Sequence, residues 1–206
     1  MTEMTPHLAA QRLQEGNKRF ISGVKSVDSL LAHSKMADLA EKGQKPFAIV
    51  LTCSDSRSPA EMIFDEGIGE LFVVRVAGNV VAPSLIASME FAVANFHSSI
   101  LVVLGHTKCG AVDACIKHVQ DPVKELPSPH LEELIARIRP AVERSMIQHP
   151  IGEGAFLNHA IKENVLRSRS LILEQSRIIR EAQERKELIV QPAILDISTG
   201  IVQFLS

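Results

Sequence analysis

Four runs of apolar residues, each as long as a β-strand, divide the sequence. Few polar residues interrupt these runs, so strands formed there would be buried on both faces of a sheet. The runs cover residues 47–52, 71–77, 99–104 and 188–197. A fifth run at 201–205 follows a Ser-Thr-Gly turn and predicts a strand that pairs back antiparallel as an edge hairpin.

Helical patterns separate the predicted strands. Thr5 and Pro6 predict the start of an N-terminal helix, and Gly16 and Gly23 bracket its end. The other predicted helices cover residues 30–40, 59–66, 83–96, 109–119, 130–148 and 156–184. Because strands buried on both faces alternate with helices, we expect an α/β fold: a single domain with a mostly parallel central β-sheet flanked by helices, an antiparallel edge strand and an N-terminal helical arm.

Length and composition agree with one globular domain. The chain has 206 residues, and 46% of them are hydrophobic, which is enough to bury a core. Within that domain, residues 1–45 are expected to form the helical arm and 46–120 the core that carries the candidate site. Residues 121–206 are expected to form a helical segment and the C-terminal hairpin.

Charge, hydropathy and cysteine content exclude several classes of partner. Lys and Arg number 22 against 24 Asp and Glu, so nothing draws the chain to nucleic acid or to an anionic membrane. No apolar run approaches the roughly 20 residues of a membrane helix, and the first residues carry no secretory signal pattern. Three cysteines, an odd number, favour a reducing compartment. We therefore expect a cytoplasmic protein that acts on a small molecule.

The residues with metal-binding chemistry fall at strand ends. Cys53 follows the first predicted strand and His106 follows the third, with Cys109 three residues later. Ligands of open α/β sheets bind at the carboxyl ends of the strands. Two thiolates and one imidazole suit Zn²⁺, and three protein ligands would leave a fourth position for water, as in catalytic zinc sites. On spacing alone, thiols that are merely buried explain the pattern equally well.

Asp55 and Arg57 add to this candidate site. In an extended segment they would point the same way as Cys53, and the arginine would keep the carboxylate ionised and oriented. Asp55 could accept a hydrogen bond from zinc-bound water, or could itself take the fourth zinc position. Spacing alone favours a plainer alternative, a surface salt bridge in a turn. Cys115, on an apolar helical pattern, is expected to be a packed thiol.

Four motifs occur along the chain in a fixed order. They are C-x-D-x-R at 53–57, R-x-A-G-N at 75–79, S-x-E-F-A at 88–92 and G-H-x-x-C-G at 105–110, accompanied by L-x-x-G-N-x-x-F at 13–20 and D-I-S-T-G-x-V at 196–202. With this order and spacing the sequence resembles the β-class carbonic anhydrases, in their prokaryotic branch, over nearly its whole length. The resemblance implies a zinc lyase that interconverts CO2 and bicarbonate.

The resemblance also implies roles for the site residues. Cys53, His106 and Cys109 would ligate Zn²⁺, and zinc-bound hydroxide would attack CO2 to give bicarbonate. Water would then displace the bicarbonate, and loss of a proton from that water would regenerate the hydroxide. Asp55 and Arg57 would form the dyad that decides whether water reaches the fourth zinc position, with Asp55 as the fourth ligand in a closed state.

Three further residues are candidates for substrate binding on the same grounds. Gln44 lies nine residues before Cys53, where one subclass of the family places a glutamine that binds substrate. Phe72 and Phe91 would line an apolar CO2 pocket, with Phe91 in place of a common tyrosine; for Phe72 alone, an ordinary core position is the better interpretation. The family resemblance implies a homodimer or a dimer of dimers, in which Gln44 would serve the neighbouring subunit's pocket.

Two other functions remain open at this point. A hydrolase of carbonyl sulfide or carbon disulfide could use the same scaffold with a few changes in the pocket. A non-catalytic zinc-binding module could keep its fourth position closed by Asp55, but Arg57, which can draw Asp55 off the metal, argues against that alternative.

Overall fold

The predicted apolar runs form the strands of one sheet in the computed structural model, which describes residues 4–24, 26, 32–123, 125–151 and 154–206. The strands are β1 (Ala48–Thr52), β2 (Leu71–Arg75), β3 (Ile100–His106), β4 (Ile189–Leu195) and β5 (Val202–Phe204), in the order β2-β1-β3-β4-β5. All pairings are parallel except β4 with β5, which is antiparallel. The predicted α/β fold with an antiparallel edge strand is therefore confirmed.

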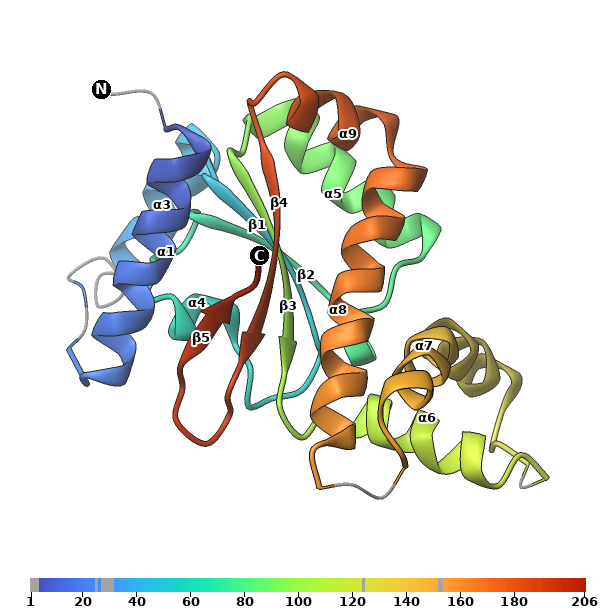
Figure 1. Ribbon diagram of the computed structural model, residues 1–206. Coiled ribbons are helices and arrows are strands. Elements are labelled where there is room, and N and C mark those ends of the chain that lie inside the picture. Colours follow the sequence, from blue (N-terminus) through green and yellow to red (C-terminus); the bar gives the residue numbers. More distant parts are fainter. Residues whose placement is uncertain (1–3, 25, 27–31, 124, 152–153) are drawn as a thin grey trace.

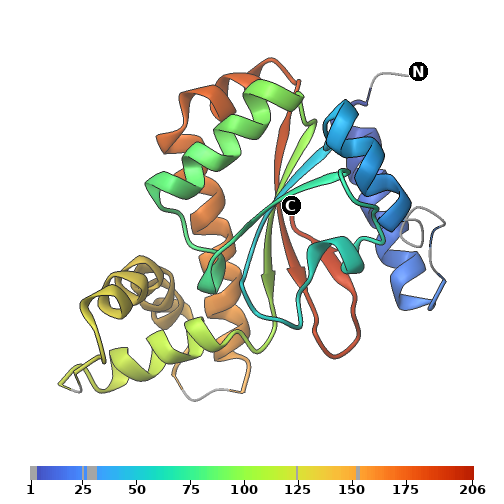
Figure 2. The same ribbon diagram turned by 180° about the vertical axis from the view of Figure 1, so that it is seen from behind.

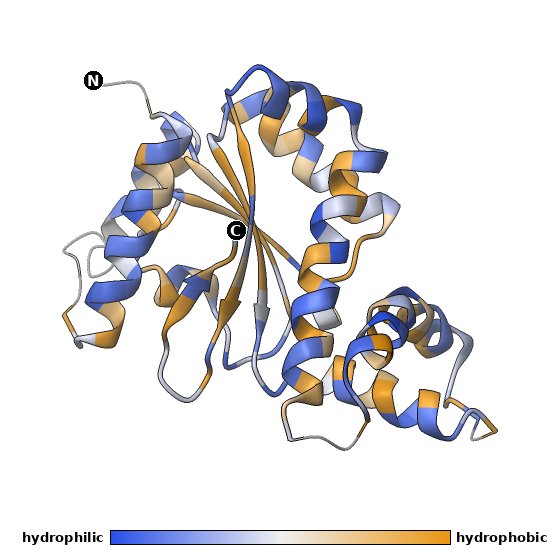
Figure 3. Cartoon of the chain, in the orientation of Figure 1, coloured by the Kyte–Doolittle hydropathy of each residue, from blue (hydrophilic) through white to orange (hydrophobic). Residues whose placement is uncertain are grey.

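Helices cover both faces of this sheet (Figures 1 and 2). One face carries α5 (Pro83–Phe96), α8 (Phe156–Gln175) and α9 (Arg177–Glu184), and the other carries α1 (Pro6–Ile21). Both central strands, β1 and β3, are buried along their whole length. Figure 3 shows the same division, with apolar strands in the middle and hydrophilic outer helix surfaces. This burial on both faces explains why the strands read as continuous apolar runs.

Four helices of the described residues remain, of which α4 joins α1 in the apolar cluster on the second face of the sheet. They are α3 (Ala32–Lys42), α4 (Ala60–Ile63), α6 (Gly110–Gln120) and α7 (Pro129–Gln148). The pair α6 and α7 packs with the start of α8 around a separate apolar cluster, next to the end of β3 (Figure 1). None of the described helices combines the length and the apolarity that a membrane crossing requires.

The N-terminal helix begins and ends where the sequence predicts. The Thr5 side chain accepts a hydrogen bond from the Leu8 N–H at 3.3 Å, and Pro6 is the first helical residue. The helix ends at Ile21, between the two glycines expected to bracket its end. Its apolar side, including the fully buried Leu13, packs on the sheet of its own chain.

The prediction of a single helix over 156–184 is wrong. The helix is interrupted at Ser176, where α8 ends and α9 begins. Ser176 is extended, with φ of −103° and ψ of 109°. Its hydroxyl accepts a hydrogen bond from the Ile179 N–H at 3.2 Å and donates one to Glu90 of α5 at 2.6 Å. A serine that bonds to the backbone this way caps a new helix instead of continuing the old one.

The register of the central strands sets the position of the candidate site. Thr52 of β1 lies opposite Arg75 of β2 and Leu104 of β3, so the segments that follow all three strands emerge at the same edge. After β2, which ends two residues earlier than predicted, the chain makes a short 3₁₀ turn, η1 (Ala77–Asn79).

Candidate metal centre

Three metal-binding side chains meet at the carboxyl edge of the sheet. Cys53 follows β1, His106 ends β3, and Cys109 caps the start of α6. Their donor atoms, two sulfurs and one ring nitrogen, all lie within 4.8 Å of one another, and all three residues are buried. Among the described residues, no other group of three His, Cys, Asp or Glu side chains meets the same condition.

The His106 ring is oriented for binding a metal. Its Nδ1 lies 2.9 Å from the Thr107 carbonyl oxygen, which can only accept, so Nδ1 carries the proton. Its Nε2 then presents a lone pair, and this buried atom has no hydrogen-bond partner in the described part of the chain. Thr107 is itself fixed, because its Oγ1 accepts from the Ile197 N–H at 3.1 Å. Histidines that bind metals are oriented by such a bond to the other ring nitrogen.

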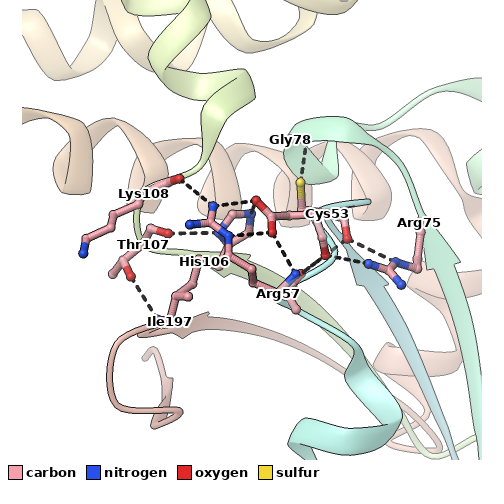
Figure 4. A network of polar contacts seen from close by, with 10 residues as sticks. Cys53, Arg57, Arg75, Gly78, His106, Thr107, Lys108 and Ile197 are labelled. Atoms are coloured by element: carbon pink, nitrogen blue, oxygen red, sulfur yellow. Dashed lines mark hydrogen bonds and ion pairs between the residues drawn. The ribbon is translucent and has the colours of Figure 1, made fainter.

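The two sulfurs differ in their environment. The Cys109 thiol donates to Cys53 and, with the Gly78 N–H, holds the pKa of Cys53 well below its usual range. The same bond and burial raise the pKa of Cys109. Figure 4 shows the Gly78 N–H pointing at the Cys53 sulfur, at 3.3 Å. One sulfur is therefore already stabilised as the thiolate, which is the form that binds a metal.

Asp55 and Arg57 form a bidentate ion pair beside these donors. The Arg57 Nε and Nη2 donate to the two carboxylate oxygens of Asp55 at 2.9 and 2.7 Å. These hydrogen bonds from Arg57 hold the pKa of Asp55 well below its usual range. The Asp55 Oδ2 lies 4.0 Å from the His106 Nε2. The carboxylate is thus ionised, next to the donors, and already paired.

The segment that carries this pair is a turn, as the plainer alternative of a salt bridge in a turn predicted, and it is not extended. The Ser58 N–H donates to the Asp55 carbonyl at 3.1 Å, and the Arg57 N–H donates to the Asp55 carboxylate at 2.9 Å. Aspartate commonly closes a turn by bonding the N–H two residues ahead. The turn, rather than strand alternation, brings the two side chains together.

Several supporting groups were not identified from the sequence as parts of the site. The Arg75 guanidinium donates to the carbonyls of Cys53 and Asp55 at 3.2 and 2.7 Å, which fixes the chain between them (Figure 4). The Lys108 carbonyl accepts from Arg57 at 3.4 Å. Arg75 and Gly78 belong to the R-x-A-G-N motif, so the sequence did contain a signal for these two residues. Thr107 and Lys108 bond His106 and Arg57 through their backbone carbonyls, which any residue would supply.

Within one chain, the structure does not bring Gln44, Phe72 and Phe91 to the three donors. Gln44 precedes β1, at the opposite edge of the sheet from Cys53, and five strand residues span about 16 Å. The Phe72 and Phe91 rings contact each other, with centroids 6.3 Å apart, and both contact Phe96. Phe91 is 53% exposed. Phe96 was not singled out from the sequence.

Comparisons with known proteins point to one family. The family model described as "Carbonic anhydrase" matches residues 48–202. The protein named carbonic anhydrase 2 of Mycobacterium tuberculosis strain H37Rv is 40% identical over 142 residues, which cover 69% of this chain and 67% of that protein. Among solved structures, the β-carbonic anhydrase CcaA superposes with a TM-score of 0.76 at 25% identity, covering 96% of this chain and 95% of that one.

A third comparison concerns the fold alone. A crystal structure described as one of two tetrameric β-carbonic anhydrases from Sordaria macrospora has a TM-score of 0.73 at 23% identity. It covers 97% of this chain and 95% of that one.

Proposed function

Because this chain belongs to the β-class carbonic anhydrases, we propose that it hydrates CO2 reversibly to bicarbonate and a proton at a zinc ion held by Cys53, His106 and Cys109. The observation that carries the proposal is the convergence of two sulfurs and one imidazole nitrogen within 4.8 Å, buried at the carboxyl edge of the sheet. The named relatives are carbonic anhydrases, which does not favour the sulfur-substrate hydrolase.

The residues fit a zinc ion in number and kind. Zinc prefers sulfur and nitrogen ligands, and the buried Nε2 of His106 has no other partner among the described residues. When bound, zinc supplies a Lewis acid that lowers the pKa of water and so provides the nucleophile at neutral pH. Three protein ligands leave the fourth position for that water.

Asp55 and Arg57 keep this fourth position open. Arg57 occupies both carboxylate oxygens of Asp55, so Asp55 would have to break two charge-assisted hydrogen bonds to become a ligand. With its pKa held low, Asp55 stays ionised through the physiological range and acts as a hydrogen-bond acceptor that orients water. The non-catalytic module closed by Asp55 is therefore the weaker alternative.

The proposed partner is a second copy of the chain, and the substrate pocket lies between the two copies. Gln44 and Phe91 are exposed, and β2 is an edge strand with one unpaired side, so these elements are available to a partner subunit. The S. macrospora proteins described as tetrameric share this fold, which supports a dimer or a dimer of dimers. We place Gln44, Phe72 and Phe91 in this shared pocket. The reduced thiols that the zinc site needs support a cytoplasmic location.

A comparison of two cysteine variants tests the metal centre. Cys53→Ser removes a zinc ligand, and Cys115→Ser changes a buried cysteine outside the site. We expect Cys53→Ser to lose stoichiometric zinc and CO2 hydration, followed by stopped flow with a pH indicator, while Cys115→Ser keeps both. A wild-type protein that holds zinc but does not hydrate CO2 would contradict the proposal; carbonyl sulfide would then be the next substrate to assay.

Substitution of Arg57 tests the proposed open position. In Arg57→Ala the Asp55 carboxylate loses its partner and can reach the metal, so we expect full zinc content with CO2 hydration reduced at least about tenfold. Arg177→Ala is the control, because it removes an exposed arginine from an ion pair with Glu181 on α9. Unchanged hydration in Arg57→Ala would contradict a role of the ion pair in keeping the position open.

A further inference from the structure

The hydrogen bond from the Gly78 N–H to the Cys53 sulfur depends on the conformation of η1. Gly78 has φ of 69° and ψ of 17°, outside the right-handed helical region, and Asn79 also has a positive φ, of 44°. The bond is 3.3 Å long and buried. Neither strand pairing nor an α-helix fixes a turn of this kind, so its position must come from contacts with other elements.

Two buried polar side chains of α8 supply these contacts. Asn164 donates through Nδ2 to the Gly78 carbonyl at 2.7 Å, and Ser168 donates through Oγ to the Asn79 carbonyl at 3.0 Å. Each residue is only 2% exposed. They are four residues apart, and so lie on the same face of the helix. A buried polar group without a hydrogen-bond partner lowers the stability of the fold. The Asn164 amide and the Ser168 hydroxyl both find their partners in the carbonyls of η1.

The same face of α8 also reaches the other half of the metal centre. Gly105 directly precedes His106 on β3, and a Cβ at this position would overlap a methyl group of Val165 and lie 3.5 Å from one of Ile161. In Figure 1 the first turns of α8 run past the end of β3. One helix face thus contacts the backbone beside His106 and the turn that bonds Cys53.

We propose that Asn164 and Ser168 are positioning residues of the metal centre: they hold the carbonyls of η1 so that the Gly78 N–H donates to the Cys53 sulfur. The N–H withdraws electron density from that sulfur, and so tunes the bond it makes to the metal. The inference rests on the proposed metal site. It gives a chemical reason for two polar residues on a helix face that otherwise packs against apolar side chains.

Two variants with two matched controls test this role. Asn164→Ala and Ser168→Ala remove the donors to η1. Asn158→Ala and Ser170→Ala make the same replacements at exposed positions of the same helix. Each protein is loaded with cobalt(II), and two quantities are measured: the wavelength of the thiolate-to-cobalt charge-transfer band, and the rate at which a chelator removes the metal.

We expect Asn164→Ala to move the charge-transfer band to longer wavelength, because a sulfur without its N–H donor gives up electron density more easily. Metal loss should be about tenfold faster, the usual size of an effect from groups that orient metal ligands. Ser168→Ala should change both quantities in the same direction by a smaller amount. Both controls should behave as the wild type.

Several results would overturn the inference. If Asn164→Ala and Ser168→Ala melt at lower temperature but keep the wild-type band and rate of metal loss, the two residues only stabilise the fold. If Asn164→Ala does not fold, Ser168→Ala decides alone, and wild-type behaviour there overturns the proposal. A wild type that binds neither cobalt nor zinc would instead contradict the metal site itself, and the inference with it.

Discussion

Gly78 illustrates how single residues act in this protein through their backbone. Its positive φ of 69° turns the N–H toward Cys53, and a Cβ at this position would come within 2.8 Å of Ile138 and 3.2 Å of Ala111. Glycine is therefore required at position 78 for two reasons: the backbone has a positive φ, and there is no room for a Cβ. Arg75 also supports the site through the main chain, since it bonds two carbonyls rather than a side chain.

Replacement of this glycine should destabilise the fold more than positive φ alone explains. We expect Gly78→Ala to lower the free energy of unfolding by about 2–4 kcal/mol, because left-handed strain and a steric clash add. Gly43→Ala is the control: Gly43 has φ of 75° with nothing near its Cβ position, so only the strain of about 1 kcal/mol applies. Urea unfolding measures both variants. If the two variants lose the same free energy of unfolding, the close approach of the new Cβ to Ile138 does not contribute to the loss.

Cys115 should be a poorly reactive thiol. Burial raises its pKa to about 11, so at pH 8 only about one molecule in a thousand carries the thiolate, the form that reacts. Alkylation of Cys115 in the native protein should therefore be slow and should accelerate about tenfold per pH unit below pH 11, as followed by mass spectrometry of the labelled peptide. Labelling at pH 8 that is as fast as in the unfolded chain would contradict this burial.

At the scale of elements, side-chain hydroxyls decide where helices start. Ser128 and Ser176 both cap helices, accepting from Leu131 and Ile179, but Ser176 also donates to Glu90 of α5. The hydrophobic pattern of α8 and α9 does not reveal their separation. Because the helix is interrupted at Ser176, α9 changes direction and packs against α5. The buried residues of α9 then complete the apolar cluster on that face of the sheet.

The two serines should differ in their contribution to stability. Ser128→Ala removes an exposed cap, and we expect it to cost about 1 kcal/mol of unfolding free energy. Ser176→Ala should cost about 2–3 kcal/mol, because it also leaves the partly buried Glu90 carboxylate without this hydroxyl. Denaturant midpoints of the two variants, measured side by side, check the difference. A smaller loss for Ser176→Ala would mean that the bond to Glu90 contributes nothing.

In the whole molecule, one side of the sheet has the features that the proposed partner subunit would need. Among the described residues, the edge strand β2 has no pairing partner on its outer side, and Phe91 and Phe96 lie on the neighbouring helix α5 in contact with Phe72. Unpaired edges and exposed aromatic rings such as that of Phe91 favour association.

A charge within this aromatic cluster should therefore prevent dimer formation. We expect Phe91→Glu to convert the proposed dimer to a monomer, as measured by light scattering coupled to size exclusion. Ile147→Glu is the control, because Ile147 is exposed on α7, away from the cluster. If Phe91→Glu stays dimeric, the second copy binds elsewhere. If Ile147→Glu also dissociates, the effect is not specific to the aromatic side.

Sequence pattern alone was enough to predict the strands and the sheet class, and it singled out the three candidate metal donors. Continuous apolar runs specify strands buried on both faces, and parallel strands put Cys53 and His106 at the same edge whatever else the chain does. The cap at Thr5 and the antiparallel hairpin were also predictable, because each depends on residues that are close together in the sequence.

The support of the site depends on contacts between elements that are far apart in the sequence. Asn164 and Ser168 meet η1 from 86 and 89 residues further along the chain, and Ser176 meets Glu90 across 86 residues. Nothing local marks these residues, since their partners are chosen by how helices pack on the sheet. The turn at Asp55 was foreseen only in the plainer alternative of a salt bridge in a turn. Side-chain alternation cannot distinguish that turn from an extended segment, because the hydrogen bonds of the Asp55 side chain compete with extended structure.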